Sequence, residues 1–123
     1  MLFHLDFQSG IPIYKQIRDQ VVLAVADGQL LPGERLPTTR ALAEDAGVNV
    51  MTVSKAYQRL KSEGYLVTDR RNGAVVCAPP GRKCLSDLQL SQLRLLAGEA
   101  KAAGLSQEEF LAQCQAAFAE MEQ

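Results

Sequence analysis

Turn-forming residues recur at short intervals through the first 81 residues and restrict what lies between them to short helices and strands. Gly28, Gly47 and Gly64 each follow a segment with helical spacing of apolar residues, and glycine readily ends a helix in the left-handed conformation. Asn72-Gly73 is a strong hairpin signal, and the Pro-Pro-Gly run at 79–81 can continue neither a helix nor a central strand. The pattern predicts three short helices, a hairpin and then a break.

The beginnings of the three predicted helices carry typical start signals. Pro12 suits the first turn of a helix, and apolar residues follow it at helical spacing. Residues 31–34, Leu-Pro-Gly-Glu, place Pro and Gly at the two central positions that a type II turn favours. Thr38 can cap a short second helix and Asn49 a third. Only a few residues therefore separate the second helix from the third.

A hairpin and a linker follow the third helix. Leu66–Asp69 and Ala74–Cys77 are short apolar segments on either side of Arg70-Arg-Asn-Gly73, which predicts a two-stranded wing. The sequence therefore predicts a mainly α fold with a small β wing, of the α+β class. We assign a winged helix-turn-helix DNA-binding domain to residues 1–78, a linker to 79–84 and a helical dimerisation region to 85–123.

The C-terminal region is predicted to contain two well-specified helices with a wide apolar surface. Ser86 with Gln89, and Ser106 with Glu109, are two capping boxes. A pair of helices that together hold about 40 residues cannot enclose apolar side chains on several faces. We therefore expect this region to pack against a second copy in a homodimer. We expect Cys114 to be buried. The predicted dimerisation residues are Leu88, Leu90, Leu93, Leu96, Phe110, Leu111, Cys114, Phe118 and Met121.

Charge is unevenly distributed along the chain. Residues 1–83 hold eleven Lys and Arg against eight Asp and Glu, a balance of +3, whereas residues 84–123 hold two against six, a balance of −4. The basic surplus of the first segment is a weak signal of nucleic-acid binding. The N-terminus carries no basic region followed by a long apolar run, and three widely spaced cysteines indicate no disulfide framework. We expect a cytoplasmic protein with no membrane partner.

The predicted order of helix, helix, turn, helix and wing is the arrangement in which the third helix enters the major groove of double-stranded DNA. Its polar and basic side chains outside the apolar face can bond base edges and phosphates, although the same pattern would also fit a solvated surface. Arginines before the hairpin tip can reach a narrow minor groove or simply keep the turn soluble. The predicted DNA-binding residues are Thr38, Thr39, Arg40, Asn49, Val50, Met51, Thr52, Ser54, Lys55, Arg59, Arg70, Arg71, Asn72 and Gly73.

The sequence gives little support to catalysis, and we predict no enzyme, no cofactor and no metal site. The single histidine, His4, has no Cys, Asp or Glu at metal-ligand spacing, and we expect it at the surface or on an edge strand. The thiol of Cys84 adjoins Lys83, and a nearby cation lowers a thiol pKa, which allows a thiol switch. The alternative is that Cys77, Cys84 and Cys114 are ordinary cysteines.

A series of short motifs recurs through residues 8 to 78 and again in the tail. The N-terminal motifs are Pro12-Ile-Tyr14, Gln16-Ile17, Gly28, Leu31-Pro-Gly-Glu34, Leu36-Pro37, Arg40-Ala-Leu-Ala43, Gly47-Val48, Thr52-Val53, Ala56-Tyr57, Leu60, Glu63-Gly64 and Gly73. The tail motif is Gly104-Leu-Ser106 with Glu108-Glu-Phe-Leu111. Together these motifs resemble the GntR family of bacterial regulators, in particular its short YtrA-like subgroup.

The resemblance implies a homodimeric repressor of its own or a transporter operon that binds an inverted-repeat operator. It also implies DNA contacts from Arg40, from the start of the third helix and from the wing near Gly73. Val50 departs from the family pattern, where an arginine is common, so a guanine contact can be replaced by contact with a thymine methyl. Arg71 replaces a frequent glycine. A small-molecule effector would have to bind between subunits or between the two domains.

A protein of another class would also fit this pattern. In a helical protein-interaction module, the winged helix would dock on a protein and the apolar tail would recruit a partner. Strong dependence of affinity on salt would favour DNA, because binding to phosphates releases counterions.

Overall fold

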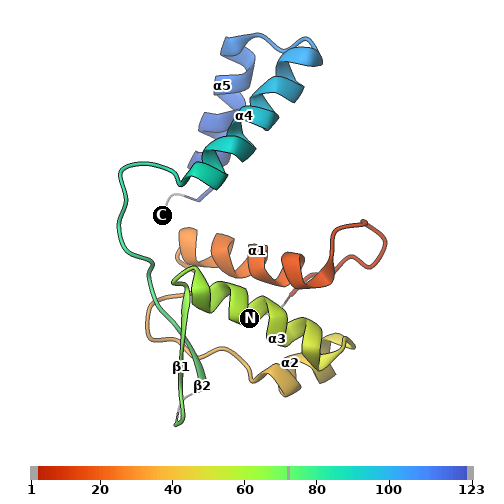
Figure 1. The fold of residues 1–123 in the computed structure, drawn as a ribbon, viewed down its shortest axis with the longest axis vertical. Helices are drawn as coiled ribbons and strands as arrows, with labels where there is room; N and C mark the ends of the chain where they lie inside the picture. The colour runs from red at the N-terminus through yellow and green to blue at the C-terminus, as the bar shows by residue number, and fades with distance from the viewer. Residues whose placement is uncertain (1–2, 72, 122–123) are drawn as a thin grey trace. The chain divides into compact units, whose positions relative to one another are not determined.

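We describe a computed structural model of the chain, which covers residues 3–71 and 73–121. The described residues form two compact units, one ending at Pro80 and the other beginning at Gly81. The first contains three helices and a β-hairpin, and the second contains two helices (Figure 1). Within the described ranges, no helix is long and apolar enough to span a membrane.

The first unit begins with an arm along helix α1, Ile13–Ala26. Gln16 accepts a hydrogen bond from the Asp6 amide at 2.8 Å and donates to the Asp6 carbonyl at 2.9 Å, and Gln20 makes the same pair of bonds with His4. Pro12 is the residue before the helix and not part of its first turn. His4 is exposed, as expected from the sequence.

Helices α2, Thr39–Ala46, and α3, Val50–Ser62, begin at the two predicted caps. The Thr38 hydroxyl accepts a hydrogen bond from the Ala41 amide, and the Asn49 side chain accepts one from the Met51 amide. The predicted turn at 31–34 also forms, because Glu34 N–H bonds the Leu31 carbonyl at 3.1 Å and Gly33 has a positive φ of 94°.

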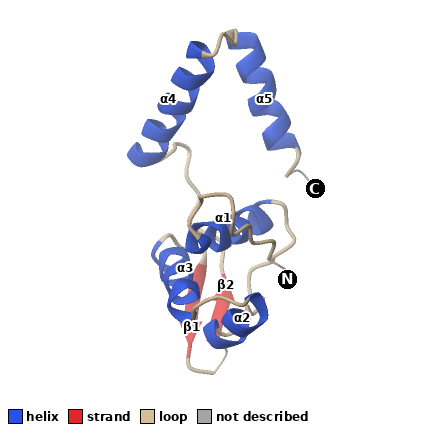
Figure 2. Ribbon diagram, turned by 90° about the vertical axis from the view of Figure 1, so that its right-hand side faces the viewer, coloured by secondary structure: helices blue, strands red, loops and turns tan. Residues whose placement is uncertain are grey.

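The hairpin consists of strands β1, Leu66–Asp69, and β2, Gly73–Val76, which pair in antiparallel register from Leu66 with Val76 to Asp69 with Gly73 (Figure 2). The second strand therefore begins one residue earlier than the sequence analysis placed it. Its other edge bonds the segment 33–36, through Leu36 N–H to the Ala74 carbonyl and Val76 N–H to the Glu34 carbonyl. Both edges of β2 are thus used.

One apolar core joins these elements. Ile17 of α1, Leu60 of α3 and Leu66 and Val76 of the hairpin are all at most 2% exposed. The Tyr57 hydroxyl donates to the Pro37 carbonyl at 2.8 Å, which ties α3 to the segment before α2. Burial raises the pKa of Tyr57 to about 12, so this phenol stays protonated and keeps donating at neutral pH.

The second unit contains α4, Asp87–Ala102, and α5, Gln107–Ala119, which diverge from a short connection (Figure 2). Both predicted capping boxes form, and the hydrogen bonds from Ser106 lower the pKa of Glu109. Neither helix has a buried residue. The expectation that Cys114 is buried is wrong for the single chain, where this cysteine is exposed because α4 and α5 do not close over it.

Candidate nucleic-acid interface

The turn between α2 and α3 fixes the direction in which α3 leaves it. Gly47 ends α2 with a left-handed φ of 70°, and Val48 N–H bonds the Ala43 carbonyl at 3.0 Å. Asn49 then caps α3 directly. Because both ends of this short turn are held by backbone hydrogen bonds and a cap, the angle between the two helices is set locally. This is the connection of a helix-turn-helix.

The buried side of α3 consists of Val53, Ala56, Tyr57 and Leu60, as its apolar spacing predicts. The opposite side carries side chains that the sequence analysis assigned to DNA, with Met51 and Lys55 exposed and Thr52, Ser54 and Arg59 half-buried. Figure 1 shows α3 as a straight rod beside the hairpin. The helix therefore presents a mostly polar face along its length.

Sequence reasoning missed Gln58 on this face. Met51, Ser54, Lys55 and Gln58 have the i, i+3, i+4, i+7 spacing of one helix stripe, and Gln58 is exposed. A glutamine amide can bond an adenine edge in the major groove through both of its polar atoms. The same helical spacing that identified the buried side would have found it.

Asn49 caps α3 and keeps hydrogen-bonding capacity for DNA. Its Oδ1 accepts the Met51 amide hydrogen bond at 2.7 Å, and its amide nitrogen has no bond among the described residues. Since the oxygen has a second lone pair, both polar atoms can still bond an adenine edge. Asn49 can therefore contact a base or a phosphate while it continues to cap α3.

Two of the predicted cations on α3 already have protein partners. The Lys55 ammonium lies 4.0 Å from the centre of the Tyr14 ring of α1, a cation–π contact. Arg59 lies 3.7 Å from the Glu63 carboxylate and is about 15 Å further along the helix than Asn49, at 1.5 Å per residue. Lys55 and Arg59 are therefore better placed to contact phosphates beside a major groove than to contact bases. The bases would be reached by residues at the start of α3.

Arg40 and Val50 lie side by side at the open end of the helix-turn-helix. With Ala43, Glu44 and Val48 they line a shallow depression between α2 and α3. Arg40 is in the first turn of α2 and is exposed, while Thr38 caps that helix and Thr39 is half-buried. The predicted proximity of Arg40 to the start of α3 is therefore found in the structure.

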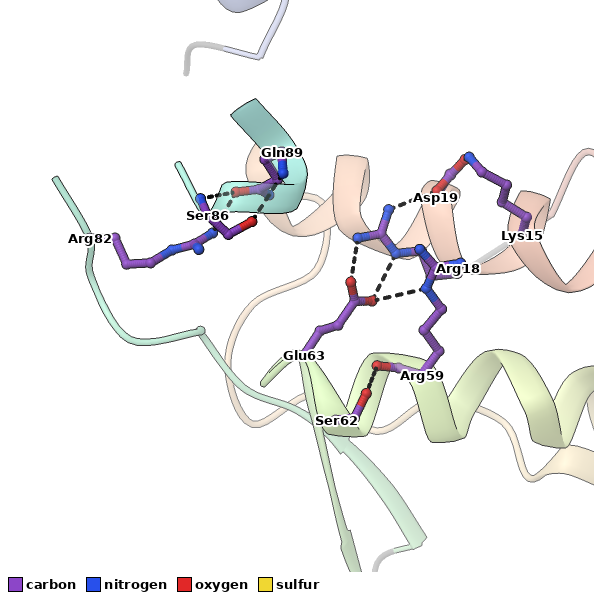
Figure 3. A network of polar contacts seen from close by, with 9 residues as sticks. All are labelled: Lys15, Arg18, Asp19, Arg59, Ser62, Glu63, Arg82, Ser86 and Gln89. Atoms are coloured by element: carbon purple, nitrogen blue, oxygen red, sulfur yellow. Dashed lines mark hydrogen bonds and ion pairs between the residues drawn. The ribbon is translucent and has the colours of Figure 1, made fainter. Parts of the chain in front are cut away.

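An ion-pair network joins α1 to the far end of α3 (Figure 3). The Arg18 guanidinium bonds both Glu63 carboxylate oxygens at 2.9 Å and Asp19 at 2.8 Å, and Asp19 also pairs with Lys15 at 2.8 Å. The Glu63 hydrogen bonds raise the pKa of Arg18 against the opposing effect of burial. Although burial raises the pKa of Asp19, hydrogen bonds from Lys15 and Arg18 lower it on balance.

Replacing Asp19 with asparagine should therefore make stability less sensitive to acid. The wild-type carboxylate has a lower pKa folded than unfolded, so its contribution is present above the unfolded value of about 4 and is lost as pH falls through the folded value. Urea unfolding should give Asp19→Asn a lower free energy of unfolding than the wild type at pH 7, and a smaller decrease of that free energy below about pH 5. If the free energy of unfolding falls equally steeply with acid in both proteins, Asp19 is not the group responsible.

The wing brings two arginines to the hairpin tip. Arg70 and Arg71 are exposed, Gly73 has a φ of 70°, and the Arg71 amide bonds the Asp69 carboxylate at 2.7 Å. Lys61 of α3 donates to the Thr68 hydroxyl of β1 at 2.9 Å, so a hydrogen bond links the wing to α3. Asn72, also predicted to contact DNA, lies outside the described residues.

No group of three or more His, Cys, Asp or Glu that could hold a metal occurs within residues 3–71 and 73–121. The three cysteines are free. Cys84 and Cys114 are exposed, and the Cys77 thiol donates to the Gly64 carbonyl at 3.1 Å. A thiol switch at Cys84 stays a hypothesis, and its alternative is that all three are ordinary cysteines.

Residues 13–76 match the model of the bacterial regulatory proteins of the gntR family, a span that runs from the start of α1 to the end of β2. The chain belongs to the GntR family. Members of this family are DNA-binding transcription regulators and not enzymes, which confirms the resemblance, the fold class and the prediction of no enzyme.

The transcriptional repressor YtrA of Bacillus subtilis is 39% identical over 75 residues, which are 61% of this chain and 58% of that protein. The chain spans 35% to 60% of the length of the first curated relatives it matches. A crystal structure described as a transcriptional antiterminator from Listeria monocytogenes covers 98% of this chain and 92% of its own, with 29% identity and a TM-score of 0.80. The DNA-binding domain of AraR, solved with operator ORE1, covers 63% and 94%, with 27% identity and a TM-score of 0.51.

Proposed function

We propose that this GntR-family chain is a sequence-specific transcription regulator that binds an inverted-repeat operator as a homodimer and represses its own or a transporter operon. The observation that carries the proposal is the exposed polar face of α3, held by a capped helix-turn-helix beside a wing with two arginines. The solved complex of the AraR domain with its operator supports this use of the fold. A regulator of chromosomal DNA would act in the cytoplasm.

In the proposed complex, the N-terminal half of α3 lies in the major groove. Thr52, Ser54 and the donor nitrogen of Asn49 contact base edges, and Arg40 reaches a base or a phosphate from α2. Arg70 and Arg71 approach the adjacent minor groove or its phosphates, and Gly73 lets the hairpin turn there. Thr38, Thr39, Lys55 and Arg59 fix the position of the protein through phosphates.

The second unit supports a homodimer because it cannot form a core alone. Its helices bury no residue. Between them lies an open groove of about 500 Å³ lined mostly by apolar side chains, among them Leu96 and Phe110, together with Glu99 and Gln113. Leu88, Phe118 and Leu111 are also exposed. A second copy offers apolar helix surfaces of the same kind, so pairing two units buries both. The other members of the proposed interface are Leu90, Leu93 and Met121.

A dimer would present two recognition helices to successive major grooves about 34 Å apart. The second unit would set their separation, and a small-molecule effector would act by changing it. Because the groove between α4 and α5 is open, such an effector would need a second subunit to complete its site.

Arg40→Ala and Thr52→Ala should reduce discrimination between operator and random DNA by about 10- to 100-fold, whereas Arg70→Ala should weaken binding to all sequences about equally. The reason is that, in the proposed complex, Arg40 and Thr52 reach bases, whereas Arg70 approaches the sugar-phosphate backbone of DNA. Titrations of fluorescent operator and random duplexes at two salt concentrations measure both quantities. Equal losses on every DNA for all three variants would contradict this division.

Selection of bound fragments from random duplexes, followed by footprinting at 50 and 200 mM salt, tests the proposal as a whole. We expect a protected inverted repeat and an affinity that falls steeply with salt. Absence of any selected sequence, together with salt-independent binding to a protein partner, would overturn it in favour of the protein-interaction module.

A further inference from the structure

The exposed face of α3 is polar except at its first turn. Val50 is 38% exposed and Met51 is 70% exposed, and both precede the buried side of the helix that begins at Val53. Neither side chain belongs to the core cluster of the first unit or to the partly buried residues packed against it. Two adjacent apolar side chains therefore stand at the end of α3 that would meet bases first.

The neighbours of Val50 make this position suitable for recognition of shape. Val50 lines the depression that Arg40, Glu44 and Val48 also line, so a cation and a carboxylate belong to the same depression. A β-branched side chain in a helix strongly prefers one χ1 rotamer and so presents a rigid surface. Asn49, which caps the helix through Oδ1, fixes the backbone of the same turn.

We propose, on the basis of the function proposed above, that Val50 with Met51 recognises the C5-methyl group of a thymine in each half-site. In the major groove thymine differs from cytosine by this methyl and by an O4 acceptor in place of an amino donor. A guanine facing Val50 would have its N7 and O6 acceptors covered by a side chain that cannot donate to them, which is costly. The apolar pair thus selects for a T·A pair and against a G·C pair at one position.

The specificity of Val50 and Met51 for thymine can be tested by removing one methyl group from the DNA. In the operator selected by the wild-type protein, each thymine of a half-site is replaced in turn by deoxyuridine, which lacks only that methyl. One position per half-site should weaken wild-type binding by about three- to fivefold, the effect of one buried methyl. Val50→Ala should bind the thymine operator more weakly and lose most of the difference between thymine and uracil.

Three further measurements separate a methyl contact from a general loss of affinity. Val67→Ala makes the same change at a valine of β1 that is 50% exposed and should keep the full difference between thymine and uracil. Val50→Arg should shift the selected base at this position towards guanine, because an arginine can donate to N7 and O6. An operator with 5-methylcytosine there should bind more tightly than one with cytosine to the wild type and to Val67→Ala, but not to Val50→Ala.

The outcomes distinguish this inference from the function on which it rests. If an inverted repeat is selected and footprinted but no thymine-to-uracil change alters binding, or Val50→Ala keeps the same sensitivity as the wild type, the methyl contact is wrong and the regulator stands. If no operator is selected at all, the proposed function fails and this inference fails with it.

Discussion

Replacing Leu96 with glutamate should reduce affinity for an inverted-repeat operator by at least about 100-fold. Leu96 is 55% exposed and lines the apolar groove between α4 and α5 with Phe110. In the proposed dimer this groove is covered, so the glutamate would bury an unpaired charge. A monomer engages only one half-site, and the gain from linking two binding units, of about 10²- to 10⁴-fold, is lost.

Sedimentation equilibrium and operator titration on the same samples measure the two effects. Ser91→Glu is the matched control, since it introduces the same carboxylate at an exposed position of α4 that does not line the groove. We expect this control to remain a dimer with normal affinity. A Leu96→Glu protein that stays dimeric, or that becomes monomeric without loss of operator affinity, would contradict the role of the second unit.

The features that sequence reasoning predicted correctly are encoded locally. Thr38, Asn49, Ser86 and Ser106 each accept a backbone hydrogen bond at the helix start where they were predicted to do so. A cap depends on a few consecutive residues, and the same holds for the turn at 31–34. The helices, the helix-turn-helix and the position of the wing follow from such signals together with helical spacing.

Apart from Gln58, which helical spacing would have found, the missed features depend on contacts between distant residues. The pairing of segment 33–36 with β2 joins positions about 40 residues apart, and segment 33–36 has no strand pattern of its own. The bonds from Arg18 to Glu63 and the contact of Lys55 with Tyr14 likewise require the packed arrangement of α1 and α3. The Lys55 contact also changes the site, because it gives one cation of α3 a partner on α1.

The exposure of Cys114 illustrates a different limit. Its place on an apolar stripe predicts burial, and the stripe is indeed apolar, yet nothing among residues 3–71 and 73–121 covers this side of α5. Periodicity identifies a surface that favours burial but does not say which molecule provides the cover. A second subunit would reconcile the pattern with the exposure.

Replacing Leu60 with alanine should lower the free energy of unfolding of the winged-helix unit by about 3 kcal/mol. Leu60 is fully buried, and the core around it joins α1, α3 and the hairpin through Ile17, Leu66 and Val76. Removing its isobutyl group loses apolar burial and leaves a cavity that three different elements would have to close. Because the wing and α3 share this core, operator affinity measured near the unfolding midpoint should fall as well.

Tyrosine fluorescence reports this unit selectively in the full-length chain. The sequence has no tryptophan, and all three tyrosines, Tyr14, Tyr57 and Tyr65, belong to the first unit. Leu23→Ala is the matched control because Leu23 of α1 is 52% exposed, and its loss should change the free energy by less than about 1 kcal/mol. Similar urea midpoints for Leu60→Ala and Leu23→Ala would mean that the core does not depend on Leu60, and that the hairpin is held to α3 by its polar contacts instead.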